Sequence, residues 1–177
     1  MLKFIKQISP TFIKQLLSKI KSKLIVSNRK KLLVERMRQK HRLLVIDLES
    51  KDKVKVVFLV IHASVWKVDS VFRQMLQDPY FDPEILICPY VQDDEERMQE
   101  DMNQAYNFFK NKCYPVTKSQ KADGSWVMLD DIKPDIVFFT NPYKITITEY
   151  YENAYFNYLT CYIPYYFMAT THAGDEF

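Results

Sequence analysis

Residues that could carry chemistry stand directly after four apolar runs of this sequence. The runs are residues 56–61, 85–88, 136–139 and 161–163, and they are followed by His62, Pro89-Tyr90, Thr140-Asn141-Pro142-Tyr143 and Pro164-Tyr165. Continuous apolar runs are typical of parallel strands that are buried on both faces. Ligands of such sheets bind beyond the carboxyl ends of the strands, so we expect a site among these residues.

His62 is the candidate general base at these strand ends, because imidazole readily takes a proton from a hydroxyl near neutral pH. Ser64, Asn141, Tyr143 and Tyr165 are the candidate substrate contacts along the wall of the site. The alternatives are structural. His62 could cap the next helix, and Asn141 could simply stabilise a tight turn.

Trp66 and Lys67 are candidate anion contacts, since they stand where the next helix should begin. Backbone amides at the start of a helix, together with a nearby cation, can hold a phosphate. In the competing interpretation, Trp66 packs on the edge of the sheet and Lys67 is solvated.

Alternating strands and helices should position these residues. The pattern predicts strands at about 54–61, 84–88, 113–116, 135–140 and 160–163, and helices at about 65–77, 94–110 and 147–159. Right-handed crossovers then favour an α/β, Rossmann-like parallel sheet of about five strands in the order 3-2-1-4-5, with helices on both faces. In that order His62 and Asn141-Pro142-Tyr143 should face each other across the crevice between strands one and four.

Two of the predicted helices have a recognisable inner face. The apolar face of the helix at 94–110 consists of Met98, Met102, Ala105, Tyr106 and Phe109. The helix at 147–159 should begin with a capping box formed by Thr146 and Glu149. Its inner face should consist of Tyr151, Tyr155, Tyr158 and Leu159.

The first 50 residues form a strongly basic arm. Residues 1–46 hold 13 Lys and Arg against one acid, Glu35, and the remainder of the chain holds 12 bases and 21 acids, the balance of its 25 and 22. Apolar residues recur at helical spacing, and Ser9-Pro10 is a good helix start, so we expect two basic amphipathic helices. The arm could pack on the body, bind an anionic membrane surface or bind nucleic acid, and the last is the weakest reading because no recognition motif accompanies the cations.

We therefore divide the chain into a basic helical arm at 1–50, an α/β body at 51–167 and a tail or linker at 168–177. Only two glycines are present, which excludes the glycine-rich turns of dinucleotide-binding domains and P-loops. The three cysteines form no C-x-x-C pair, and Cys88 and Cys161 fall inside predicted buried strands, which favours a reducing cytosol. We expect no metal, no cofactor and no membrane-spanning segment.

Tyrosine is concentrated near the end of the body. Eight of the twelve tyrosines lie between Tyr143 and Tyr166. A phenol presents an apolar face and a polar tip, which suits a domain interface or the wall of a sugar-binding site, and of these two the interface is favoured.

Three segments carry a resemblance to a known family. They are VVFLVIHASVWKVDSVF, IKPDIVFFTNPYKIT and LTCYIPYYF, and they resemble the amino-terminal half of bacterial CDP-glycerol glycerophosphotransferase-like proteins, which make teichoic-acid and capsular polymers. The similarity covers about residues 54–167. Where such proteins have a small residue, this chain has Tyr166, and where they continue into a donor-binding domain, it reads residues 168–177.

The resemblance implies a GT-B type transferase with two Rossmann-like domains, bound peripherally to the cytoplasmic face of the membrane. The first domain would handle a polyol-phosphate or glycan acceptor, and a second domain would bind the CDP-linked donor. It also implies that a histidine activates the acceptor hydroxyl, a role that we carry over to His62. On this basis we expect little activity from this domain alone, and the alternative is a non-catalytic, membrane-associated binding or adaptor domain.

Overall fold

The structure is a computed structural model of the chain. It describes residues 10–141 and 143–164, with the side chains described from residue 28 onward. The chain divides into two units, residues 1–42 and residues 43–177, and each is described by itself.

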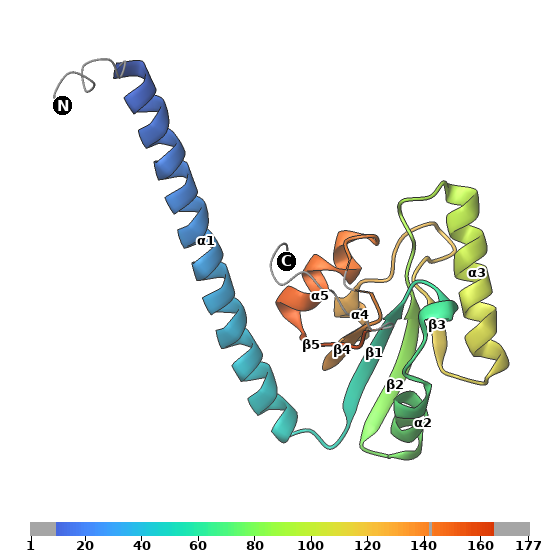
Figure 1. The fold of residues 1–177 in the computed structure, drawn as a ribbon. Coiled ribbons are helices and arrows are strands. Elements are labelled where there is room, and N and C mark those ends of the chain that lie inside the picture. Colours follow the sequence, from blue (N-terminus) through green and yellow to red (C-terminus); the bar gives the residue numbers. More distant parts are fainter. Residues whose placement is uncertain (1–9, 142, 165–177) are drawn as a thin grey trace, which may run out of the picture. The chain divides into compact units, whose positions relative to one another are not determined.

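The body contains one five-stranded sheet in which all the strands run parallel (Figure 1). Its strands are β1 (Val54–Val60), β2 (Phe81–Ile87), β3 (Val116–Lys118), β4 (Ile136–Phe139) and β5 (Leu159–Tyr162). Their order is β3-β2-β1-β4-β5, which confirms the predicted α/β, Rossmann-like fold and its strand order. The third strand begins three residues later than predicted, because Cys113 adopts a left-handed backbone conformation with φ of 58° and ends the preceding turn.

Helices cover both faces of the sheet. They are α2 (Asp69–Gln77), α3 (Glu95–Asn111), α4 (Leu129–Ile132) and α5 (Glu152–Asn157), with short 3-10 turns at η1 (Ala63–Val65) and η2 (Thr148–Tyr150). Figure 1 shows α3 and α5 on opposite sides of the sheet.

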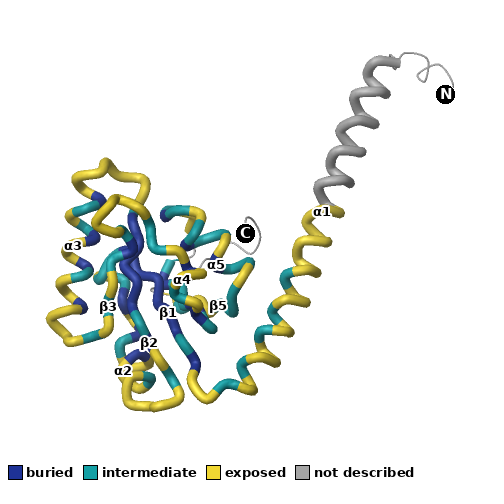
Figure 2. The backbone as a smooth tube through the Cα atoms, turned by 180° about the vertical axis from the view of Figure 1, so that it is seen from behind, coloured by how far each residue is buried: buried dark blue, intermediate teal, exposed yellow. Residues whose placement is uncertain are grey.

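Successive residues of β1 contact opposite layers. Val56, Phe58 and Val60 pack in one cluster with residues of α2 and α3, whereas Val57 and Leu59 pack in the other with residues of α4 and α5. This alternation follows from the two-residue period of a strand. It explains why residues 56–61 are apolar throughout, and why β1 is buried along nearly its whole length (Figure 2).

The segment after β1 differs from the single helix predicted at 65–77. It forms the η1 turn, and α2 begins only at Asp69. Between them the backbone of Trp66 is extended, with φ of −71° and ψ of 100°. The indole is buried edge-on against Phe58, Phe72 and Phe109, and burying so large an apolar ring outweighs continuing the helix.

The predicted capping box of Thr146 and Glu149 is wrong. The Thr146 hydroxyl is buried and has no hydrogen-bond partner among the described residues. Glu149 instead accepts a hydrogen bond from the backbone N–H of Leu129, at 2.8 Å. The helix is also broken at Tyr151, so the residues that face the core are Tyr150 and Ala154 rather than Tyr151 and Tyr155.

The arm is one helix, α1 (Pro10–Glu49), where two were predicted. Residues 11–49 contain neither proline nor glycine, so nothing in this stretch interrupts a helix. Among its described side chains, the apolar residues are spread around the helix. Leu33, Met37, Leu44 and Leu48 lie on one side, Leu32, Leu43 and Ile46 lie on another, and Val34 and Val45 lie between them.

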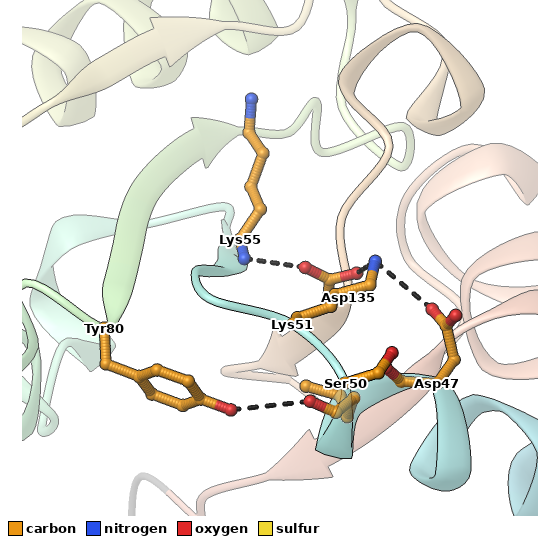
Figure 3. Close-up of polar contacts among 7 residues, drawn as sticks. Asp47, Ser50, Lys51, Lys55, Tyr80 and Asp135 are labelled. Atoms are coloured by element: carbon orange, nitrogen blue, oxygen red, sulfur yellow. Dashed lines mark hydrogen bonds and ion pairs between the residues drawn. The ribbon is translucent and has the colours of Figure 1, made fainter.

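The last turn of α1 belongs to the body and is fastened to it by polar contacts (Figure 3). The Asp135 carboxylate accepts hydrogen bonds from the Lys51 ammonium at 2.5 Å and from the backbone N–H of Lys55 at 2.8 Å. Lys51 also lies 3.3 Å from a carboxylate oxygen of Asp47. The hydrogen bond to Asp135 raises the pKa of Lys51 above its ordinary value.

Candidate functional site

His62 lies just beyond the carboxyl end of β1 and contacts helix α3. Its Nδ1 atom is 3.8 Å from a carboxylate oxygen of Asp101, and its ring centre is 5.4 Å from that of Tyr90. His62 is two residues after Val60, whose side chain faces the α3 layer, so the alternation of the strand directs both side chains to the same side. The Asp101 side chain is 11% exposed and that of His62 is 34% exposed.

These two residues line a pocket of about 420 Å³. Its wall is formed by the segment after β1 and by one side of α3, and the lining residues are His62, Ala63, Ser64, Arg97, Asp101, Gln104, Ala105 and Phe108. The structure therefore brings two of the predicted site residues, His62 and Ser64, into one pocket.

Asp101 is the residue that sequence reasoning missed. It follows Met98 by three residues and precedes Ala105 by four, so it adjoins the buried stripe of α3. A carboxylate beside a buried stripe is itself a signal, because an acidic side chain there needs a polar partner. One of its oxygens faces His62 and the other lies 3.5 Å from a guanidinium nitrogen of Arg97.

The arrangement of His62 and Asp101 suits proton transfer. A carboxylate beside one ring nitrogen stabilises the imidazolium that forms when the other nitrogen takes a proton. Arg97 lies on the far side of Asp101 and also pairs with Glu100 at 3.5 Å, so its charge is shared between two carboxylates. The pocket thus combines a proton acceptor with space for a hydroxyl compound.

Asn141 and Tyr143 lie in a turn at the end of β4. The Asn141 side-chain oxygen accepts a hydrogen bond from the backbone N–H of Tyr143 at 2.9 Å, which is the turn-stabilising role considered above. Just before them, the Thr140 hydroxyl donates to the Leu59 carbonyl and ties β4 to β1. Neither Asn141 nor Tyr143 lines the pocket of His62. Pro142 and Tyr165 lie outside the described residues.

Trp66 and Lys67 do not line the His62 pocket either. Trp66 is buried in the core, and its indole N–H donates to Asp69 at 3.0 Å. Lys67 is exposed. Lys67 is thus as in the competing interpretation, whereas Trp66 packs in the core against Phe58 of the central strand rather than on the edge of the sheet.

The thiols are separate from this pocket. Cys88 is buried, and burial raises the pKa of its thiol above the ordinary value of 9.0. The prediction that Cys161 is buried is wrong, because β5 is an edge strand and that side chain is exposed.

Neither a metal site nor a membrane span is found in the part of the chain that the structure describes. No group of three His, Cys, Asp or Glu side chains is placed there to hold a metal ion. None of the helices at residues 10–141 and 143–164 is long and apolar enough to cross a bilayer.

Comparisons with known proteins add no relative. The chain matches no protein-family model, no curated protein and no solved structure.

Proposed function

We propose that the body is the acceptor-side domain of a CDP-glycerol glycerophosphotransferase-like enzyme that builds a surface polymer. The observation that supports this most directly is the pocket beyond β1, in which His62 lies beside the carboxylate of Asp101. Its place at the carboxyl edge of a parallel sheet is where α/β enzymes bind their ligands. The resemblance of the strand-end segments supplies the reaction class.

In the proposed reaction, His62 takes the proton of an acceptor hydroxyl as its oxygen attacks the β-phosphorus of the donor. The new P–O bond forms while the bond between the β-phosphorus and the bridging oxygen breaks, and CMP leaves with that oxygen. The Asp101 carboxylate, 3.8 Å from Nδ1, would stabilise the imidazolium that results, with Nε2 as the proton acceptor. Ser64 contributes a hydroxyl to the wall of the pocket.

The CDP-linked donor would be held by a second domain that acts together with this one. The body has neither a glycine-rich turn to approach the diphosphate nor a described metal site to neutralise it. The domain described here would accordingly position and activate the acceptor, while the charge on the phosphates is stabilised elsewhere.

The test is an assay for the transfer of glycerol phosphate from CDP-glycerol to a poly(glycerol phosphate) acceptor. The transfer is measured by the release of CMP. The assay requires the natural full-length protein. We expect His62→Ala to lower kcat by roughly 10²-fold to 10⁴-fold, the usual contribution of a positioned base. His41→Ala, which changes a histidine of the arm, is the matched control and should leave kcat unchanged. Turnover of the His62 variant within about twofold of wild type would end the assignment.

Substitutions of Asp101 distinguish an effect on catalysis from an effect on acceptor binding in the same assay. Asp101 acts through His62 in this proposal. We therefore expect Asp101→Asn to lower kcat by about tenfold or more and to leave KM nearly constant. Asp101→Glu should recover part of the loss. A change confined to KM would show that Asp101 acts on acceptor binding rather than on the base.

We also propose that α1 binds the anionic cytoplasmic surface of a membrane. The support is the charge of residues 1–46 together with the exposed apolar side chains of Leu32, Leu43 and Ile46. This observation equally favours the second candidate function, a membrane-associated binding or adaptor domain without catalysis. Membrane binding by a full-length protein that lacks transferase activity would favour that second candidate.

A further inference from the structure

A second hollow lies at the carboxyl edge of the sheet, on the face that carries α5. Its volume is about 240 Å³. The lining residues are Phe139, Tyr151, Tyr155, Thr160 and Tyr162, which come from β4, from β5 and from the segment that includes α5. Phe139 and Tyr162 are register partners on adjacent strands, so their side chains lie next to each other on the sheet.

The described residues that line this hollow are uncharged, and all but Thr160 are aromatic. It combines four aromatic rings with the hydroxyl groups of Thr160 and of three tyrosines. The rings of Tyr151 and Tyr155 meet edge to face, with their centres 5.6 Å apart. Burial raises the pKa of Tyr155 above its ordinary value, so its phenol stays neutral and can both donate and accept hydrogen bonds.

The charge of the lining residues distinguishes anionic from neutral ligands. A phosphate or nucleotide needs cations or free amides around it, and none of the described residues that line this hollow is charged. The nearby Lys144 is paired with Glu152 at 2.5 Å, so their charges offset each other. A neutral ligand with one apolar face and several hydroxyls matches the lining.

We infer that this hollow binds a neutral hexopyranose ring of a glycan. The C–H face of the sugar would stack on the tyrosine rings, and its hydroxyls would bond to the phenols and to Thr160. The volume is below that of sites for drug-sized ligands and suits a single ring. The inference rests on the proposed function for its biological sense, because the sugar would be a part of the acceptor other than the hydroxyl that reacts in the pocket of His62.

The experiment measures binding of methyl glucoside, methyl galactoside and methyl N-acetylglucosaminide by saturation-transfer and protein-observed NMR. We expect saturable binding of at least one glycoside, with the signals of Tyr151, Tyr155 and Tyr162 shifting. Tyr155→Leu should weaken this binding about fivefold to tenfold, in line with the contribution of one aromatic contact. Tyr155→Phe should weaken it less.

Three controls keep the outcome interpretable. Tyr106→Leu alters a tyrosine beside β3, far from this lining, and should bind as wild type does. Tyr162→Ser changes an exposed position of the edge strand and provides a second test if Tyr155→Leu fails to fold. His62→Ala should bind the glycoside normally, so that loss of transfer and loss of sugar binding are told apart. Absence of saturable binding, or tighter binding of cytidine than of any glycoside, would overturn the inference.

Discussion

Asp69 collects hydrogen-bond donors from three parts of the body at the start of α2. One of its oxygens accepts from the Trp66 indole at 3.0 Å, the Lys112 ammonium at 2.9 Å and the Tyr114 hydroxyl at 3.0 Å. The bond with Lys112, followed by those with Trp66 and Tyr114, holds the pKa of this carboxyl below its ordinary value of 3.8. A single side chain therefore fastens the Trp66 segment to the end of α3.

Because the pKa of Asp69 is lowered in the folded state, we expect the free energy of unfolding to depend on pH in the acid range. The folded state favours the carboxylate, so its contribution is complete above the ordinary pKa and is lost as pH falls through the lower folded value. Asp69→Asn should reduce the free energy of unfolding by about 1–2 kcal/mol near pH 7. The difference from wild type should shrink toward about pH 2 in urea unfolding curves. A difference that stays constant with pH would contradict the prediction.

At the scale of elements, α1 is the part whose role is most open to direct test. We expect binding to anionic vesicles to fall by at least about a thousandfold when four arm lysines become Glu, since each lysine contributes about 1 kcal/mol near such a surface and each Glu is repelled by it. These lysines are Lys14, Lys19, Lys21 and Lys23.

The matched control makes the same change of charge on the body. It replaces four of the exposed lysines of the body with Glu, namely Lys53, Lys67, Lys110 and Lys121. Binding should then fall far less, and co-sedimentation measures both variants. Equal losses would show that total charge, and not the arm, governs attraction to the vesicles.

Element boundaries were the least predictable part of the fold from sequence. The apolar runs located the strands, because a strand buried on both faces leaves a continuous signal. The helices after β1 and β4 were misjudged because tertiary packing overrode helical periodicity at Trp66 and Tyr151. Within a few residues of such a break, the face that meets the core also changes, as Tyr150 and Ala154 show.

At the scale of the whole molecule, the strand order was predictable because right-handed crossovers allow few alternatives. That order predicted His62 and Ser64 at the carboxyl edge of the sheet, where the structure has them, but it predicted a crevice shared with Asn141 and Tyr143, which do not line the pocket. The strand order alone does not point to Asp101, and the signal for this residue is its place beside the apolar stripe of α3. The strand order also does not show that the side-chain oxygen of Asn141 accepts a hydrogen bond from the backbone of its own turn.

The junction between the arm helix and the sheet gives a prediction at this scale. Asp135→Asn removes the ion pair with Lys51 and weakens the bond from the Lys55 N–H, both of them partly buried. We expect a loss of about 1–2 kcal/mol in the free energy of unfolding and faster hydrogen exchange of amides at residues 44–49. The control is Asp82→Asn, whose pair with Lys53 is exposed and 3.7 Å long, and it should change stability by less than about 0.5 kcal/mol. Unchanged exchange at residues 44–49 in Asp135→Asn would refute the role of this contact.

Neighbouring side chains of β1 face opposite layers, and this limits where the chain can tolerate an inserted residue. The distance in sequence between Val60 and His62 decides which layer the imidazole meets. A single extra residue between Ile61 and His62 would turn the ring away from Asp101 and leave the interior of the sheet intact. Chain length at this point, as much as the identity of the histidine, therefore determines whether the base and its carboxylate stay together.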